Sequence, residues 1–475
     1  MKSTAKNILV FSLVICTFQA FGQPAKDQIP GSWQGVLNVG SQEFRLVFNL
    51  SLSEDDSFSA TLDSPDQGAM AIPLGEVSLA EDSIRIEAPV VKGFYLGKFT
   101  SDSSLNGEWY QSGRSFTLDL DKQAKAFVLN RPQEPQPPYP YKEEEISFSN
   151  TIQGFSLGGT LSLPEGEGPF PAVLLVSGSG SQNRDEEIFG HKPFKLIADQ
   201  LTRDGIAVLR YDDRGVASSG GNSTGASTGD YAEDARSAID YLLKRSEIDH
   251  SKIGIIGHSE GGMIAFILAS SHDDIGFIIT LSGPGVDGKT ILLEQSEHIA
   301  RLSGVSPSIL EDNNIVMTEV YDIMIANESF QVWEEEVLNF TSKFYSEKGT
   351  EVYNEGDIER GKNNLLSSIP ESAYVWMRYF VMFDPASLFG SINCPVLALN
   401  GEKDCQVLPE QNIDAIKSGF NSSGNEKVTT MMLPGLNHLF QNCETGLPNE
   451  YGIIEETFDQ KTLDIMSDWI LKSLD

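Results

Sequence analysis

The sequence predicts an α/β fold, in which a doubly wound, mostly parallel sheet with a helical insertion follows a small all-β, barrel-like domain. Three observations predict it. Apolar and polar positions alternate over residues 28–130, as in strands with one solvated face. From residue 145 onward, apolar runs recur without alternation, as in strands that are covered on both faces. Helical patterns separate these runs, which is typical of an α/β domain.

A targeting segment is expected at residues 1–22. Lys2 and Lys6 precede an apolar run at residues 8–20, which is too short to span a bilayer and matches a signal-peptide core. Small residues on either side of Phe21 favour cleavage before Gln23. We therefore expect an exported protein, periplasmic or secreted. No other segment reaches about 18 apolar residues, so no membrane span is expected.

The net charge excludes some partners. The chain carries 68 acidic and 34 basic residues, a formal charge of -34, in 475 residues. Removing residues 1–22 deletes two lysines and no acids, so the mature charge would be -36. Such a field repels the phosphates of nucleic acids and anionic lipids, so neither is an expected partner. Neither charge nor length indicates an oligomeric state.

The first domain is expected at residues 23–130. Alternation predicts strands at 31–37, 44–50, 83–87 and 115–120, separated by Gly, Asp and Ser clusters. A barrel or curved meander is the natural architecture. Trp33 and Trp109 are interpreted as core aromatic residues, and a carbohydrate or lipid contact is the alternative.

A proline-rich linker is expected at residues 131–144. Five prolines fall within nine residues there, namely Pro132, Pro135, Pro137, Pro138 and Pro140. This composition favours an extended, semi-rigid spacer. The second domain would then occupy residues 145–475.

The second domain opens with a hairpin-like stretch at 146–163. Buried strands are predicted at 172–176, 206–209, 253–256, 277–281 and 396–399. Apolar residues from Tyr231 to Leu243 recur at helical spacing, with Ser227 or Thr228 as the N-cap. An insertion at about 286–392, with helical, acidic stretches, is expected to form a cap. Such a cap either roofs an acyl pocket or packs for stability alone.

Ser259 is the expected nucleophile. It lies in Gly-His-Ser-Glu-Gly, between the strand at 253–256 and a helical run from Met263. This G-x-S-x-G context, strand then tight turn then helix, is a nucleophile elbow. The turn lifts the hydroxyl out of the sheet, and the helix N-terminus favours developing negative charge.

A serine nucleophile needs a base, and the base needs an orienting carboxylate. His438 follows the apolar run at 428–433, and Asp404 follows the strand at 396–399, with Glu402 as its rival. The order Ser259, Asp404, His438 is that of the α/β-hydrolase triad. His258 is expected to point away from the hydroxyl. The remaining histidines are expected to be structural or solvated, although His191 could line the cleft.

Two backbone donors are expected to hold the oxyanion. One is the N–H of Glu260, after the nucleophile, and the other is the N–H of Ser179, in the loop after the first long strand. Gly180 is the alternative to Ser179. No metal site is expected.

Four motifs, at 177–185, 210–215, 257–262 and 435–440, carry a family resemblance. They look like those of exported or two-domain bacterial α/β-hydrolase esterases, often described as serine aminopeptidase-like, over roughly residues 145–475. The resemblance implies hydrolysis of carboxylic esters with short acyl groups and no cofactor. In that comparison, Asp212, Asp213 and Arg214 look like a turn that braces the active-site loops, with anion binding by Arg214 as the alternative. The β-domain resembles the small, lipocalin-like domains that precede some such hydrolases.

A disulfide is predicted between Cys405 and Cys443, because Cys405 adjoins Asp404, Cys443 lies five residues past His438, and the triad brings those loops together. The function that follows is a carboxylesterase acting on a small-molecule ester. A serine peptidase on the same fold is the nearest alternative. It would need an acidic anchor for a substrate amine, and the candidates are Glu334, Glu335, Glu336, Asp357 and Glu359. A non-catalytic binder of carbohydrate or of a partner is the second alternative.

Overall fold

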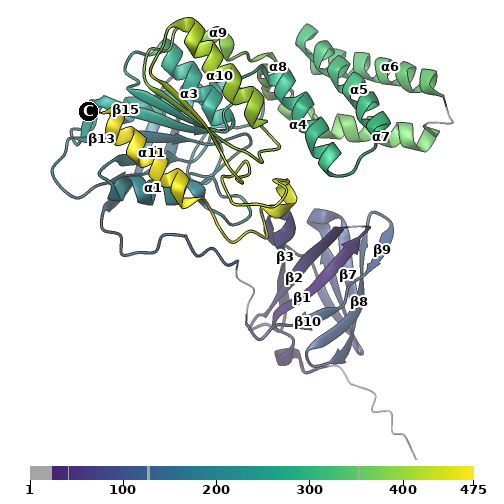
Figure 1. The fold of residues 1–475 in the computed structure, drawn as a ribbon. Coiled ribbons are helices and arrows are strands. Elements are labelled where there is room, and N and C mark those ends of the chain that lie inside the picture. The colour runs from purple at the N-terminus through teal and green to yellow at the C-terminus, as the bar shows by residue number, and fades with distance from the viewer. Residues whose placement is uncertain (1–23, 41, 126–128, 350–352, 475) are drawn as a thin grey trace, which may run out of the picture. The chain divides into compact units, whose positions relative to one another are not determined.

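The computed structural model describes residues 24–40, 42–125, 129–349 and 353–474, so the predicted leader lies outside it. The described residues fold as two compact units, which divide between Leu129 and Asn130 (Figure 1). Among the described residues, no helix combines the length and the apolar character needed to cross a membrane.

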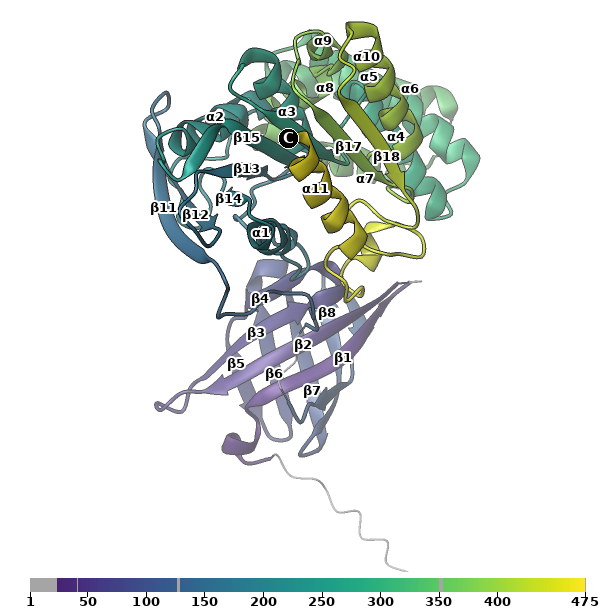
Figure 2. The same ribbon diagram turned by 60° about the vertical axis from the view of Figure 1, so that its left-hand side comes forward.

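The first unit is one curved antiparallel sheet (Figure 2). Its strands are β1 (Gly31–Val39), β2 (Gln42–Leu52), β3 (Phe58–Ser64), β4 (Ala69–Pro73), β5 (Val77–Ala80), β6 (Ser83–Ala88), β7 (Gly93–Ser101), β8 (Ser104–Gln111), β9 (Arg114–Thr117) and β10 (Leu120–Lys122). The order is β4-β3-β2-β1-β10-β8-β7-β6-β5, and β9 pairs with β8. Trp33 and Trp109 are buried in its core, which confirms their interpretation as core residues.

The strand predicted at 115–120 is divided in the structure. Phe116 is half-buried and Leu118 and Leu120 are buried, so the alternation itself continues through the break between β9 and β10, and what changes there is the pairing. The Leu118 N–H donates to the Gly107 carbonyl, and β10 then pairs with β1 as well as β8.

The predicted linker is not a free spacer, because much of it is bound to the second unit. Arg131 donates to the carbonyls of Phe189, Gly452 and Ile454, and Gln133 bonds both backbone groups of Phe458. Its last residues already belong to β11, which begins at Lys142. Proline content predicts an extended backbone, but it does not reveal these side-chain anchors.

The second unit is built on an eight-stranded sheet. Its strands are β11 (Lys142–Asn150), β12 (Phe155–Leu163), β13 (Phe170–Val176), β14 (Ala207–Tyr211), β15 (Ile248–His258), β16 (Phe277–Leu281), β17 (Val396–Gly401) and β18 (Val428–Leu433). The order is β11-β12-β14-β13-β15-β16-β17-β18. The hairpin β11–β12 is antiparallel, and β12 pairs antiparallel with β14. The other six strands, which are β14, β13, β15, β16, β17 and β18 in sheet order, are parallel, so the predicted doubly wound fold is confirmed.

Helices cover both faces of this sheet (Figure 2). On one face lie α2 (Thr228–Leu242), α3 (Glu260–Ser271), α9 (Ala386–Phe389) and α10 (Pro409–Ser423). On the other lie α1 (Pro193–Arg203) and α11 (Gln460–Ser473). Of the two predicted caps of α2, the structure selects Ser227, which exchanges hydrogen bonds with Asp230.

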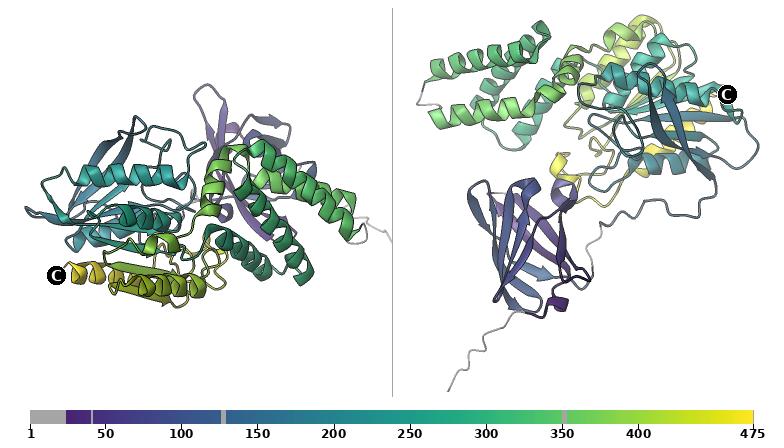
Figure 3. Two further views of the ribbon diagram at one scale, coloured as in Figure 1. Left: turned by 90° about the horizontal axis from the view of Figure 1, so that it is seen from above. Right: turned by 180° about the vertical axis from the view of Figure 1, so that it is seen from behind.

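The expected insertion is helical. Its helices are α4 (Gly288–Leu302), α5 (Pro307–Ala326), α6 (Phe330–Lys348), α7 (Glu355–Ser368) and α8 (Glu371–Met382). They pack around their own core, which includes Val320, Trp333 and Tyr374. Figure 3 shows this insertion, in green, projecting from the α/β core. Among the described residues of the insertion, those that line the cavity at Ser259 come from α4 and α8.

Candidate active site

Ser259 lies at a strained turn between β15 and α3. Its backbone is left-handed (φ 53°, ψ −117°), a conformation that costs a non-glycine residue about 1–3 kcal/mol and that clusters at functional sites. The flanking glycines permit the turn. A Cβ on Gly257 would lie 2.0 Å from the Gly261 carbonyl oxygen, and one on Gly261 would lie 2.1 Å from that of Val176. This is the geometry of a nucleophile elbow.

The predicted base and acid are in contact. His438 Nδ1 lies 2.8 Å from Asp404 Oδ2, and both side chains are buried. Asp404 also accepts the N–H groups of Gln406 and Val407 and the amide of Asn400. Burial alone would raise the pKa of Asp404, but the His438 charge and these donors hold it below its usual value. The carboxylate can therefore fix the imidazole with Nε2 free to act. The rival, Glu402, accepts the Gly435 N–H instead.

Ser259 and His438 line one cavity of about 380 Å³. No hydrogen bond joins their side chains within the described part of the chain. Catalytic hydrogen bonds are often long in the free enzyme and tighten with substrate, so the arrangement remains competent.

The two expected oxyanion donors are available. Ser179 lines the same cavity as Ser259, and Glu260 is the first residue of α3. Neither N–H donates to another group of the described residues. The Gly178 N–H, in contrast, is occupied by Glu186 Oε1 at 2.7 Å. Gly180, the alternative donor, has a left-handed backbone (φ 97°) in the same loop.

His258 points away from Ser259, as expected, and its partner Glu186 was not anticipated. His258 Nδ1 lies 2.9 Å from Glu186 Oε1, and Nε2 lies 3.0 Å from the His438 carbonyl oxygen. Burial would lower the pKa of His258, but the Glu186 charge and both hydrogen bonds raise it. Glu186 is the middle residue of the acidic run Asp185-Glu186-Glu187 in a loop, and no sequence pattern distinguishes it from its two neighbours.

The Glu260 side chain ties the elbow to the insertion. Its Oε1 accepts the Thr228 hydroxyl at 2.7 Å and the Trp376 indole N–H, from α8, at 2.8 Å. Burial raises its pKa, although these two donors and the Ser179 side chain oppose that rise. Trp376 therefore has a defined position against the catalytic loops.

The turn at Asp212–Arg214 is structural, as the resemblance implies. Asp212 accepts Arg184 through both carboxylate oxygens, and Arg214 is buried against Asp234 at 2.7 Å. Asp213 accepts the Gln182 N–H from the oxyanion loop. Arg214 is thus committed to Asp234 rather than to an external anion.

The predicted disulfide is not formed, because Cys405 and Cys443 are both free thiols. The physical reason is the direction of each thiol. Cys405 Sγ donates to the Gly446 carbonyl at 3.0 Å, whereas Cys443 Sγ donates to that of Gly435 at 3.4 Å. Proximity to the triad brought the two loops together without aligning the sulfur atoms.

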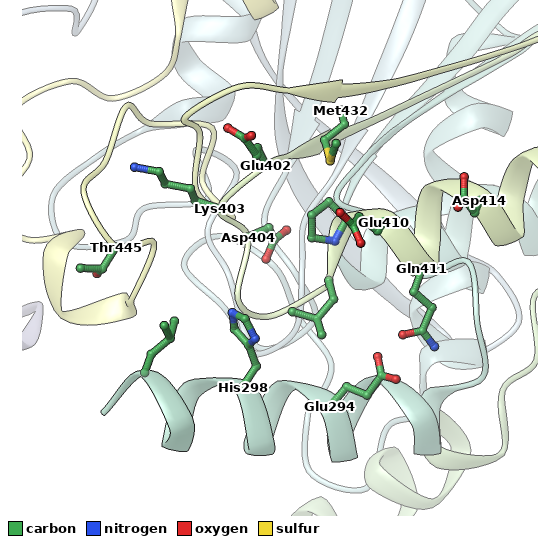
Figure 4. Close-up of a pocket in the computed structure, with 13 residues that line it drawn as sticks. Glu294, His298, Glu402, Lys403, Asp404, Glu410, Gln411, Asp414, Met432 and Thr445 are labelled. Atoms are coloured by element: carbon green, nitrogen blue, oxygen red, sulfur yellow. The ribbon is translucent and has the colours of Figure 1, made fainter. Parts of the chain in front are cut away.

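His191 and His298 are both absent from the described lining of the cavity at Ser259. His191 is buried and bonded to the Thr457 hydroxyl and the Tyr451 carbonyl. Burial, with the charge of Arg131, lowers its pKa to about 4. His298 lies on α4 in a second cavity of about 740 Å³ beside the Asp404 loop (Figure 4). Asp404 is the only triad residue among the described residues that line this second cavity.

The strand order, the elbow and the His438–Asp404 pair define an α/β hydrolase. Known proteins agree with this class. Residues 191–325 match the family described as serine aminopeptidase, S33. Esterase EstD of Thermotoga maritima is 27% identical over 336 residues, covering 70% of this chain and 69% of that protein. An uncharacterized 31.7 kDa protein of Escherichia coli is 24% identical over 340 residues, covering 70% of this chain and all of that protein.

Among solved structures, a Pyrococcus furiosus esterase covers 73% of this chain and 98% of its own, with a TM-score of 0.43 and 13% identity. The fold and the site geometry, together with the similarity to the S33 family and to EstD, indicate a hydrolase of the esterase type.

Proposed function

We propose that the protein hydrolyses uncharged carboxylic esters with short acyl groups through an acyl-enzyme on Ser259. Ser259 Oγ attacks the acyl carbonyl while His438 takes its proton, and Asp404 orients the imidazole. The N–H groups of Glu260 and Ser179 hold the oxyanion. His438 then protonates the departing alcohol, and water, activated by the same base, releases the acid and frees Ser259.

The cavity around Ser259 is the observation that carries this proposal. Its volume of about 380 Å³ lies at the small end of ligand pockets, which favours a short acyl group. One wall is apolar and comes from the insertion and a neighbouring loop, with Ile291, Leu292, Trp376, Phe380 and Val407. This wall supports an alkyl or aryl acyl group rather than a charged one.

A peptidase activity on the same fold receives less support. An aminopeptidase needs an acid that faces the substrate amine, but Glu334, Glu335, Glu336 and Glu359 are absent from the described lining of the cavity. The side chain of Asp357 lies outside the described residues. The one acid in that lining, Glu186, is held by His258 and the Gly178 N–H.

Parallel assays on p-nitrophenyl esters and aminoacyl p-nitroanilides test the proposal. We expect hydrolysis of p-nitrophenyl acetate and butyrate, little cleavage of the anilides, and loss of ester hydrolysis in a folded Ser259→Ala variant. Unchanged ester hydrolysis in Ser259→Ala would falsify the mechanism. Faster cleavage of the anilides would assign the peptidase activity instead.

We also propose export, on the charge and apolar pattern of residues 1–22 alone. N-terminal sequencing of the protein from the periplasm or the medium should begin at Gln23. A cytoplasmic protein that retains Met1 or Lys2 would contradict this proposal.

A further inference from the structure

A buried pair of side chains, Glu186 and His258, joins the three loops that form the candidate site. His258 precedes Ser259 in the elbow. Its Nδ1 lies 2.9 Å from Glu186 Oε1, in the oxyanion loop, and its Nε2 lies 3.0 Å from the carbonyl oxygen of His438, the base. Glu186 Oε1 also accepts the Gly178 N–H at 2.7 Å, next to Ser179.

The partners of His258 determine where its protons lie. A backbone carbonyl can only accept, so Nε2 must carry a hydrogen. Glu186 Oε1 already accepts a backbone N–H and is an acceptor toward Nδ1 as well, so that nitrogen also carries a hydrogen. His258 is then an imidazolium that is neutralised by the Glu186 carboxylate, and both side chains are buried.

The backbone at Glu186 supports a role for its side chain. Glu186 has a left-handed conformation (φ 50°), which favours glycine, yet the position carries a long acid that is aimed into the protein. Ser259 shares this strain, with φ 53°. A loop that needed only the turn would be served better by glycine.

We propose that Glu186 and His258 are positioning residues, an imidazolium–carboxylate pair that holds the oxyanion loop, the nucleophile elbow and the base loop in one catalytic geometry. Neither touches the reacting atoms. The pair fixes Gly178, and with it the Ser179 N–H, and it fixes the backbone of His438. This inference rests on the proposed Ser259 chemistry and adds the residues that align it.

The first test reads the charge state of His258. In the full-length protein labelled with ¹⁵N-histidine, NMR at pH 7.5 should show two protonated ring nitrogens for His258, assigned by comparison with His258→Gln. His191 is the internal reference, since it is also buried and hydrogen-bonded at both ring nitrogens, with the Thr457 hydroxyl as one of its partners. Because the pKa of His191 is about 4, its ring is neutral at pH 7.5. A singly protonated His258 would overturn the ion pair.

The second test reads the reactivity of Ser259 without any assumed substrate. A fluorophosphonate labels the nucleophile when Oγ attacks phosphorus and fluoride leaves, a step that uses the same base and oxyanion donors. We expect Glu186→Leu and His258→Gln to slow labelling about 10²-fold, as when one oxyanion donor is lost. Glu186→Gln keeps an acceptor for Gly178 without the charge, and we expect a loss of about tenfold.

Glu187→Gln is the matched control, because Glu187 is exposed on the same loop and its removal should leave the rate unchanged. On p-nitrophenyl butyrate, the Glu186 and His258 variants should lose kcat with KM nearly unchanged. Because a smaller folded fraction would lower the apparent kcat in the same way, kcat is expressed per active site titrated with the fluorophosphonate. Labelling of Glu186→Gln and His258→Gln at the wild-type rate would overturn the inference. A wild-type protein that is not labelled at Ser259 would instead overturn the proposed function.

Discussion

Trp376 forms part of the apolar wall of the cavity at Ser259, so its removal should change which acyl groups the enzyme accepts. The indole lies against Phe380, with ring centroids 5.6 Å apart, and its N–H is held by Glu260. Trp376→Ala would extend the cavity of about 380 Å³ toward α8. Acyl chains that are too long for the wild-type cavity should then fit.

The magnitude follows from the apolar surface that each added methylene buries. Burying one methylene contributes about 0.8 kcal/mol. Two methylenes, the difference between a butyryl and a hexanoyl group, contribute about 1.6 kcal/mol, or roughly 15-fold in kcat/KM. We therefore expect Trp376→Ala to raise the hexanoate-to-butyrate ratio of kcat/KM by up to about 15-fold.

The assay is kcat/KM on p-nitrophenyl esters from acetate to octanoate, with Trp376→Phe and Trp333→Phe as controls. Trp376→Phe keeps an aromatic wall but leaves Glu260 without its indole donor. It should hold the acyl ratio within about twofold and destabilise the second unit by about 1.5–3 kcal/mol. For a unit of about 350 residues that is a Tm shift of roughly 2–4 °C.

Trp333 lies in the core of the insertion, donates to the Val320 carbonyl and does not line the cavity. Its replacement by Phe should therefore affect Tm alone. If folded Trp376→Ala keeps the wild-type acyl ratio within about twofold, Trp376 does not limit the acyl group and the assignment of this wall is wrong.

Three further predictions concern the acid, a buried histidine and the thiols. Asp404→Asn should lower kcat on p-nitrophenyl butyrate by about 10³–10⁴-fold with the fold retained by circular dichroism, because the imidazole loses its orienting charge; a loss below tenfold would contradict the assigned role. The pKa of His191 is about 4 in the folded state and about 6.5 in the unfolded state. Between these pH values the unfolded state binds more protons, so the free energy of unfolding falls as the pH drops from about 6.5 to about 4, by roughly 3 kcal/mol in total. His191→Gln should flatten Tm against pH between about 4 and 6.5, and an unaltered slope would refute this origin. Titration of the denatured protein without residues 1–22, under non-reducing conditions, should find Cys394, Cys405 and Cys443 as thiols, and a count of one would show that two of them form a disulfide.

The positions of the three candidate triad residues could be predicted because each has a local signature. Ser259 is marked by flanking glycines that no other residue can replace, since added Cβ atoms would overlap backbone on both sides. Asp404 follows β17 and His438 follows β18, and the carboxyl ends of parallel strands meet at one edge of the sheet. The strand order then brings together residues that are 34 positions apart in sequence.

The features that were missed depend on side-chain direction, which local patterns do not encode. Glu186 and His258 are 72 residues apart, and Glu186 belongs to a loop without periodicity. Cys405 and Cys443 showed the opposite error. Their loops do meet, but each thiol turns to a different backbone carbonyl. Sequence can place loops at a shared edge, whereas the rotamers that decide a bond follow from packing.

The large negative charge of the chain does not extend to the cavity where the substrate would bind. Of its described lining residues only Glu186 is acidic, and His258 neutralises it. Glu260, next to Ser259, is enclosed by Thr228 and Trp376 and is absent from that lining. The surface field would slow the approach of anionic esters, while the one carboxylate in the described lining is already paired with His258 and is not available to bind a cation. A neutral ester is the substrate that meets neither obstacle, and for such a substrate kcat/KM should depend only weakly on ionic strength.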